Sequence, residues 1–236
     1  KRDILYVGDT ARVPYGNKSA ETVEAYSREI IGFLRSKGVE RIVAACNTAS
    51  ALAVERIGKS GGVPLHGMIE SGVKAALAAM GAGPVGVIGT SATISSGAYQ
   101  AALQAGRPGL RVVACATPLF VPLVEEGWLD HEVTEKVAQE YLAPLIREKV
   151  GVCVLACTHY PLLKNVLQRV LGSGVKLVDS SEACAELLKG VESQISEKGE
   201  LRIFLTDEPG PFLGRVETFL GRGAVGSVER IHLPRI

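Results

Sequence analysis

Short aliphatic runs alternate with longer amphipathic stretches along most of the chain. Runs of about four to eight apolar residues are typical of buried strands, whereas apolar residues three and four positions apart predict helices. The aliphatic runs predict strands over 3–9, 41–46, 63–68, 84–90, 110–116, 152–157, 175–180 and 201–207. The amphipathic stretches predict helices over 20–38, 48–60, 71–81, 94–106, 130–149, 161–172, 181–193 and near 211–221. Strands that alternate with helices in this way favour an α/β fold with mainly parallel sheets.

One segment, PLFVPLVEEG at 118–127, departs from this alternation. Its two prolines favour an irregular segment over a regular helix. The acidic pair at its end, Glu125 and Glu126, then either forms a solvated turn or brings a carboxylate to a cleft.

A weak internal repeat relates two parts of the chain. RIVAACNTASALAVERI at 41–57 resembles VCVLACTHYPLLKNVLQRV at 152–170, and Cys46 and Cys157 occupy equivalent places in the two segments. Any two strand–helix units share a hydrophobic pattern, but the matching cysteine and threonine positions exceed what that pattern requires. The repeat therefore indicates two halves of similar, doubly wound topology.

Composition narrows the class of protein. Aliphatic residues and glycine dominate, only 5% of residues are aromatic, and the formal net charge is +1 with no block of five like charges. We therefore expect neither a nucleic acid nor an anionic membrane surface as a partner. No apolar run approaches the ~18 residues of a membrane-spanning helix, and the five cysteines have no spacing typical of a secreted disulfide scaffold. These features predict a cytosolic protein.

The two equivalent cysteines stand where catalytic chemistry is expected. Each is predicted at the carboxyl end of a strand, where ligands bind in open α/β sheets, and next to the start of a helix. The unpaired N–H groups of a helix start favour anions, so this setting predicts a lowered thiol pKa and a site for a carboxylate. Asn47, Thr48 and Thr158 would add side-chain donors. Two thiols on opposite sides of one ligand could invert a stereocentre, since one removes a proton and the other delivers one.

Further candidates lie close to these cysteines or at other strand ends. His159 follows Cys157 by two residues and could assist proton transfer or stabilise a thiolate. Tyr15 and Gly16 lie on the loop after the first predicted strand, together with Asp9 and Arg12. The other histidines, at 66, 131 and 232, fit ordinary polar roles.

Other interpretations of these motifs are weaker. Cys115, Cys153 and Cys184 fit the interiors of strands or helices, where buried cysteine is a small apolar residue. A zinc site is disfavoured because Cys153, Cys157 and His159 have no second Cys-x-x-Cys pair beside them. GPVGVIGTSAT at 83–93 lacks the G-x-G-x-x-G pattern of a dinucleotide site. We therefore expect neither a metal nor an organic cofactor.

The motifs together resemble those of the glutamate racemases, within the aspartate/glutamate racemase superfamily. The pair ACNTA and CTHYP carries most of the specificity, since either motif alone indicates only the superfamily. The stretches that carry the resemblance, in order, are YVGDTARVPYGNK (6–18), AACNTASA (44–51), VGVIGTSAT (85–93), PLFVPLVEEG (118–127), CTHYPLL (157–163), VDSSE (178–182) and FLTD (204–207).

The resemblance implies a cofactor-independent racemase that interconverts L- and D-glutamate, supplies D-glutamate for peptidoglycan and forms homodimers. It implies that Cys46 is the base acting on the D-enantiomer and Cys157 the base acting on the L-enantiomer, with His159 and Glu125 as auxiliary acid–base groups. The substrate-binding pairs that it implies are Tyr15–Gly16, Asn47–Thr48 and Thr158–His159. It further implies two similar α/β domains with the site between them, the first formed by 1–73 plus 184–236 and the second, inserted domain by 74–183.

The sequence departs from the family pattern at its start. The resemblance places an Asp-Ser-Gly-x-Gly-Gly strand segment before the 6–18 stretch, and the sequence has no counterpart of it. Such a segment would supply an Asp that assists the first cysteine, and we expect it to be present in the molecule upstream of Lys1. Two other functions stay open: a related racemase acting on aspartate, and an impaired glutamate-binding protein.

Overall fold

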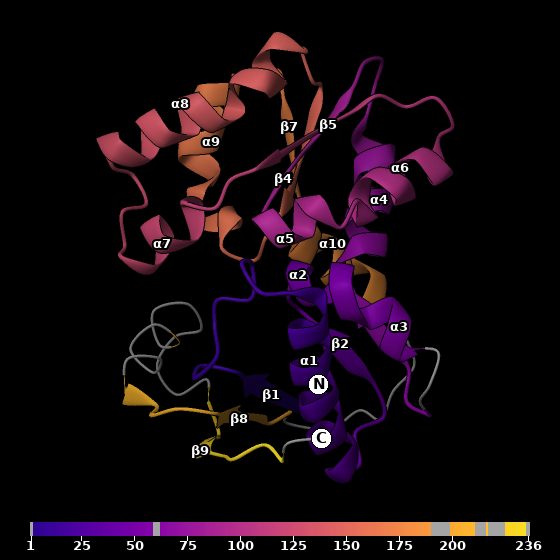
Figure 1. Cartoon of the computed structure of the whole chain (residues 1–236), viewed down its shortest axis with the longest axis vertical. Coiled ribbons are helices and arrows are strands. Elements are labelled where there is room, and N and C mark those ends of the chain that lie inside the picture. Colours follow the sequence, from indigo (N-terminus) through magenta and orange to yellow (C-terminus); the bar gives the residue numbers. More distant parts are fainter. Residues whose placement is uncertain (1, 59–61, 190–198, 211–215, 217–224, 235–236) are drawn as a thin grey trace.

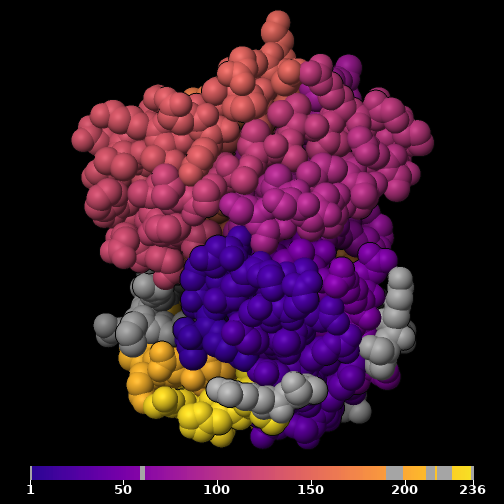
Figure 2. Space-filling view, in the orientation of Figure 1, coloured from indigo at the N-terminus to yellow at the C-terminus, as the bar shows by residue number. Residues whose placement is uncertain are grey.

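The structure is a computed structural model that describes residues 2–58, 62–189, 199–210, 216 and 225–234. Figure 1 shows these residues in two groups, one above the other. The upper group contains the strands β4 to β7, and the lower group contains β1, β2, β8 and β9, so segments from both ends of the chain lie together. In the space-filling view the indigo N-terminal residues lie directly against the magenta residues of the upper group (Figure 2).

The upper group is built on a four-stranded parallel sheet in the order β5-β4-β6-β7. Its strands are β4 (Val85–Gly89), β5 (Val112–Ala116), β6 (Val152–Ala156) and β7 (Lys176–Asp179). Every residue of the two central strands, β4 and β6, is buried. Aliphatic runs without polar alternation are what a parallel sheet covered on both faces requires.

Helices cover both faces of this sheet (Figure 1). They are α4 (Met68–Ala79), α5 (Ser91–Ser95), α6 (Ala98–Gly106), α7 (Phe120–Glu125), α8 (Glu132–Arg147) and α9 (Lys164–Leu171). Val85 and Val87 pack against α4 and α6, whereas Ile88 packs against α8 and α9. Gly86 permits this packing, because a Cβ there would lie 2.6 Å from the side chain of Leu145.

The lower group contains two smaller sheets. β1 (Ile4–Gly8), β8 (Leu201–Leu205) and β9 (Ser227–Arg230) form a parallel three-stranded sheet in that order. β2 (Ile42–Ala44) and β3 (Leu65–Gly67) form a parallel pair. α1 (Ala20–Ser36) packs on the following segments through Val23, Ile31 and Leu34. The pairing of β1 with β8 means that the chain returns to its first sheet after residue 200.

The eight predicted strands are confirmed, with ends that differ by a few residues at most. The segment predicted as a helix over 48–60 is a composite of α2 (Asn47–Ala49), the π-helical η1 (Ser50–Val54) and α3 (Glu55–Gly58). The helix predicted over 94–106 is two helices, α5 and α6, with Gly97 between them at φ 69°. The helix predicted over 161–172 begins as the 3₁₀ helix η2 (Tyr160–Leu163) before α9.

The prediction of an irregular segment at 118–127 is wrong, since Phe120–Glu125 form the helix α7. Pro122 lies in the first turn of α7, where a helix has no partner for its N–H groups, so the missing donor costs nothing there. The predicted helix over 181–193 appears as α10 (Ser180–Lys189), and the residues after 189 lie outside the described part. The helix predicted near 211–221 also falls outside the described residues, apart from position 216.

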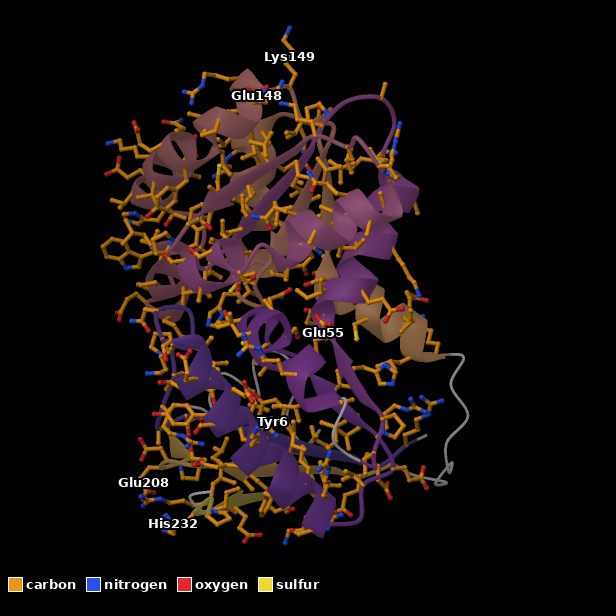
Figure 3. The ribbon with its side chains drawn as sticks, turned by 45° about the vertical axis from the view of Figure 1, so that its right-hand side comes forward. Tyr6, Glu55, Glu148, Lys149, Glu208 and His232 are labelled. Carbon is orange, nitrogen blue, oxygen red and sulfur yellow. The ribbon has the colours of Figure 1, made fainter. Side chains whose placement is uncertain are left out.

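α4 and α10 pack against each other between the upper and lower groups. α8 ends at the top of the upper group, where Glu148 and Lys149 are labelled in Figure 3, and Lys149 has φ 51°, in the left-handed region. Among the described residues, no helix combines the length and apolar character needed to cross a bilayer.

Candidate active site

Cys46 sits between β2 and α2, as the residue that caps the start of α2. Its Sγ accepts a hydrogen bond from the backbone N–H of Ala49 at 3.5 Å. Burial raises the pKa of this thiol, and the N–H groups of Ala49 and Thr48 together with the Thr48 hydroxyl offset that rise in part. The helix start therefore acts in the predicted direction, but its effect on the pKa is smaller than that of desolvation.

Cys157 occupies the matching place after β6, before η2. Burial raises the pKa of its thiol to about 12, although the N–H groups of His159, Tyr160 and Thr158 lower it. A negative charge on Cys46 raises the Cys157 pKa further, so the two thiols lie within electrostatic reach of each other. The prediction of lowered thiol pKa values is therefore wrong for both cysteines, because each loses more hydration than its N–H donors replace.

A chain of polar side chains leads away from Cys157. His159 Nδ1 lies 3.8 Å from Cys157 Sγ, and His159 Nε2 lies 2.7 Å from Glu125 Oε1, at the end of α7. Both side chains are partly exposed. This arrangement can move a proton between the thiol and solvent, since the imidazole contacts the thiol with one nitrogen and the carboxylate with the other.

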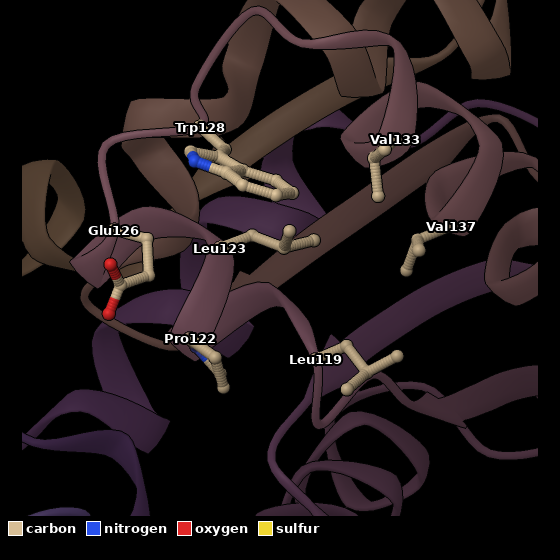
Figure 4. Close-up of a pocket in the computed structure, with 7 residues that line it drawn as sticks. All are labelled: Leu119, Pro122, Leu123, Glu126, Trp128, Val133 and Val137. Carbon is tan, nitrogen blue, oxygen red and sulfur yellow. The ribbon is translucent and has the colours of Figure 1, made fainter.

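Glu126, the neighbour of Glu125, points elsewhere. It lines an apolar groove of about 280 Å³ between α7 and α8, together with Trp128 and Val133 (Figure 4). Of the two acidic residues that sequence reasoning offered, only Glu125 contacts a predicted site residue in the described structure.

The Tyr15–Gly16 loop meets α5. The carbonyl of Gly16 accepts a hydrogen bond from Ala92 N at 3.0 Å, and a Cβ on Gly16 would lie 2.6 Å from Thr90 Cβ. Tyr15 is buried, and its hydroxyl donates to Asp9. Burial raises the pKa of Tyr15, followed by its hydrogen bond to that carboxylate. Tyr15 thus anchors the loop by its side chain, and the loop presents the backbone of Gly16 to α5.

The carboxylate of Asp9 accepts hydrogen bonds from two residues of the same loop and from Thr206, which follows β8. It accepts from Arg12 Nε at 2.9 Å, from Thr206 Oγ1 at 2.9 Å and from Tyr15. Arg12 also pairs with Glu29 and lies over the ring of Tyr26, 3.9 Å from its centroid. Asp9 and Arg12, which the sequence placed near the site, therefore hold the loop in position.

Asn47 and Thr48 are both buried, and both turn toward the upper group. Thr48 Oγ1 lies 2.9 Å from Thr90 Oγ1 and 3.1 Å from Thr93 Oγ1, and the last two hydroxyls are 2.9 Å apart. The Asn47 amide contacts Tyr99 and Ser180. Thr158, in contrast, is exposed beside Cys157.

Sequence reasoning missed four residues of this arrangement: Thr90, Thr93, Tyr99 and Ser180. Thr90 and Ser180 each follow directly after a strand, β4 and β7, so the rule that singled out the two cysteines also applies to them. Tyr99 lies inside α6 and carries no such signal. The predicted structural role of three cysteines fits their places: Cys153 and Cys184 are buried and Cys115 is half-buried on β5.

Comparisons with known proteins find one family along nearly the whole chain. The Asp/Glu/Hydantoin racemase family matches residues 2–188. The glutamate racemase of Geobacter metallireducens is 47% identical over 99% of this chain and 88% of its own length. The crystal structure of a glutamate racemase from Bacillus anthracis superposes with a TM-score of 0.91, at 32% identity, over 99% of this chain and 89% of its own.

A structure with a bound ligand is also similar. The glutamate racemase of Francisella tularensis, solved in complex with D-glutamate, has a TM-score of 0.88 and 33% identity, over 99% of this chain and 89% of its own. Family, sequence and fold agree along nearly the full length of the chain. The chain therefore belongs to the Asp/Glu/Hydantoin racemase family and, within it, to the glutamate racemases.

Proposed function

We propose that this isomerase interconverts L- and D-glutamate by transferring protons at Cα between two opposed thiols, Cys46 and Cys157. One observation supports this proposal above all. Both thiols follow a strand and lie beside backbone N–H groups of the next turn, and they are close enough for a charge on Cys46 to raise the pKa of Cys157. The Francisella tularensis relative binds D-glutamate, and the same substrate class fits the polar groups around Thr48 and His159.

The reaction needs one thiolate and one thiol. The thiolate of Cys157 takes the α-proton of L-glutamate, and the electron pair stays on Cα as a carbanion. The thiol of Cys46 then delivers a proton to the opposite face, which leaves D-glutamate, a neutral Cys157 and a thiolate at Cys46. The reverse reaction begins with that thiolate, so Cys46 acts on D-glutamate and no cofactor is required.

The raised thiol pKa values make His159 and Glu125 important to this proposal. A buried thiol must lose a proton before it can act as a base, and His159 lies 3.8 Å from Cys157 Sγ and contacts Glu125 with its other ring nitrogen. The ammonium group of the substrate would also favour a thiolate, because it brings a positive charge into the desolvated site.

Substrate contacts are assigned by position. Gly16, Asn47, Thr48, Thr158 and His159 would contact glutamate, and Tyr15 would act by holding Gly16 in place through its bond to Asp9. The site would lie between a first domain of 1–73 plus 184–236 and a second of 74–183. The separate sheets of the two groups and the packing of α4 against α10 support this division.

We also propose a cytoplasmic homodimer that supplies D-glutamate for peptidoglycan. Membership of the glutamate racemases supports this role, and glutamate is a metabolite of the cytoplasm. The oligomeric state can be measured by light scattering at several protein concentrations, where a single monomer mass throughout would refute the dimer.

Proton exchange at Cα tests the mechanism. L-glutamate or D-glutamate incubated with the protein in heavy water should gain deuterium at Cα and racemise, whereas Cys46→Ala and Cys157→Ala should not racemise either enantiomer. L-aspartate under the same conditions tests the related substrate, and we expect a much lower rate. Normal racemisation by both alanine variants would refute the two-thiol mechanism.

A further inference from the structure

The amide of Asn47 is held from two sides by residues that come from elsewhere in the chain. The hydroxyl of Tyr99, on α6, donates to Asn47 Oδ1 at 2.6 Å. Asn47 Nδ2 donates to Ser180 Oγ, at the start of α10, at 3.1 Å. The Ser180 hydroxyl in turn can donate a hydrogen bond to the carbonyl of Leu155, at 3.3 Å. The exposed fractions of Asn47, Tyr99 and Ser180 are 2%, 0% and 1%, so water does not compete for these bonds.

These contacts decide which way the amide faces. Burial raises the pKa of Tyr99, so its hydroxyl keeps its proton and must donate it. Two other acceptors lie near the Tyr99 hydroxyl: the carbonyl of Met68, which is a poorer partner at 3.4 Å, and the hydroxyl of Ser180. The contact to Asn47 Oδ1 is shorter than the one to Met68, at 2.6 Å, and Ser180 Oγ lies nearer to Asn47 Nδ2, at 3.1 Å, than to Asn47 Oδ1, at 3.4 Å. Asn47 Oδ1 is therefore the acceptor, and Nδ2 faces Ser180. An amide nitrogen carries two hydrogens, of which Ser180 takes one.

The junction leaves little room for another arrangement. Gly72 of α4 lies against it, and a Cβ there would stand 2.9 Å from the Tyr99 hydroxyl and 3.3 Å from Ser180 Cβ. The Ser71 hydroxyl lies 3.4 Å from the Ser180 carbonyl on the same side. Close packing on α4 thus fixes the Tyr99 ring and the Ser180 backbone, and these fix the amide.

We propose that Tyr99 and Ser180 are positioning residues that hold the Asn47 amide so that it offers an N–H, and not its carbonyl oxygen, to a carboxylate of the substrate. A carboxylate accepts hydrogen bonds and is repelled by a carbonyl oxygen, so the fixed amide orientation favours an anionic substrate. The inference rests on the proposed function, in which Asn47 contacts glutamate, and it assigns roles to two residues outside that set.

The first test is Tyr99→Phe, which keeps the ring and removes the donor. The KM for glutamate and the Kd for D-glutamate by calorimetry should each rise roughly three- to tenfold, the loss expected for one hydrogen bond. The kcat should change less than twofold, and the pH profile should keep its shape, because neither thiol is altered. Tyr141→Phe is the matched control: it removes a ring hydroxyl from the same half, where Tyr141 packs on Phe120, and should leave KM unchanged.

The second test is a double-mutant cycle with Asn47→Ala. If Tyr99 acts through the amide, Tyr99→Phe should add almost nothing to the KM of the Asn47→Ala variant. An equal rise in KM in both backgrounds, or an unchanged KM and Kd in the single variant, would overturn the inference. Ser180→Ala offers a second route to the same amide, and its KM should rise in the same direction if Tyr99→Phe does not fold.

A third variant, Asn47→Asp, distinguishes a fixed amide orientation from a general packing role. Asn47→Asp keeps an oxygen for Tyr99 but replaces the N–H with a second oxygen, so it should raise KM more than Asn47→Ala does. An Asp variant that binds glutamate better than the Ala variant would refute the proposed amide orientation. The unmodified protein is assayed first: a protein that binds D-glutamate without racemising it refutes the proposed function, while the calorimetric comparison of the variants still tests this inference.

Discussion

The two cysteine-bearing segments are built alike and differ in what surrounds the thiol. α1 is followed by Gly38, β2 and Cys46, and α8 is followed by Lys149, β6 and Cys157. The spacing from the left-handed residue to the cysteine is the same in both, 38 to 46 and 149 to 157. Each strand delivers its thiol to the N–H groups of the turn that follows. The helix end, strand and turn that the two segments share therefore determine the position of each thiol.

The partners of the two thiols differ in kind. Cys46 Sγ is contacted by the Ala49 N–H and lies near the Thr48 hydroxyl, groups that do not titrate near neutral pH. Cys157 lies beside His159, which is linked to the Glu125 carboxylate. The difference indicates that the shared helix end, strand and turn position the thiols. The neighbouring side chains, which differ, determine how each thiol gains and loses its proton.

Among changes to the partners of the two thiols, the largest expected effect comes from removing the imidazole beside Cys157. His159→Ala should lower kcat by roughly 10²- to 10³-fold, the usual contribution of a general acid–base group. Glu125→Gln should cost less, because the imidazole remains beside Cys157. Thr48→Val is the matched change at Cys46 and should cost least, since the backbone donor remains. Steady-state rates for the three variants measure the difference, and equal losses from His159→Ala and Thr48→Val would remove the distinction between the two sides.

The direction of the His159 effect is visible in isotope exchange. Enantiomers have equal free energies, so the equilibrium constant of the reaction is one. The kcat/KM for L-glutamate must therefore equal the kcat/KM for D-glutamate in every variant. In heavy water, however, the His159→Ala variant should return D-glutamate carrying deuterium without inversion, because Cys46 still removes a proton while delivery from Cys157 is slow. Racemisation that keeps pace with deuterium uptake would contradict this.

The contact between the two groups can be tested at Gly16. A Cβ there would lie 2.6 Å from Thr90 Cβ, so Gly16→Ala should push the loop from α5 and strain the bond from Ala92 N. We expect a loss of about 1–3 kcal/mol in the free energy of unfolding, together with lower activity. Gly58→Ala is the control, because a Cβ at Gly58 meets open space. Denaturant unfolding measures both, and an equal stability of the two variants would contradict the predicted clash.

The raised thiol pKa values predict how rate depends on pH. A base with a raised pKa is mostly protonated at neutral pH, so kcat/KM should increase as pH rises from 7 to 9 and beyond, toward the pKa of about 12 at Cys157. Thr48→Val removes a hydroxyl that lowers the Cys46 pKa. The rising limb should therefore move to higher pH in that variant, with a loss of a few-fold at pH 7, and pH–rate profiles of the two proteins measure the shift. A profile that is flat from pH 7 to 9 would refute the raised pKa values.

Most of the strands could be predicted from the sequence because strands buried on both faces, such as β4 and β6, appear as continuous aliphatic runs. It failed at Phe120–Glu125, where the position of Pro122 within the first turn decides whether a helix can form. The two thiols were predictable from the repeat, and Thr90 from its place after β4. Tyr99 was not, because its role depends on the packing of α6 against α4 and on a contact to a residue 52 positions earlier in the chain.

The smallest expected effect is a change in stability, without a change in catalysis, at the helix ends that precede the strands of the two cysteine-bearing segments. Gly38 follows α1 with φ 74° and Lys149 follows α8 with φ 51°, so equivalent positions use a residue suited to the left-handed region and one that is not. Lys149→Gly should therefore stabilise the protein by about 0.5–1 kcal/mol, and Gly38→Lys should destabilise it by a similar amount. Neither residue contacts a thiol partner, so kcat and KM should stay unchanged in both. Thermal unfolding measures the two shifts, and shifts of the same sign would show that the two helix ends are not equivalent.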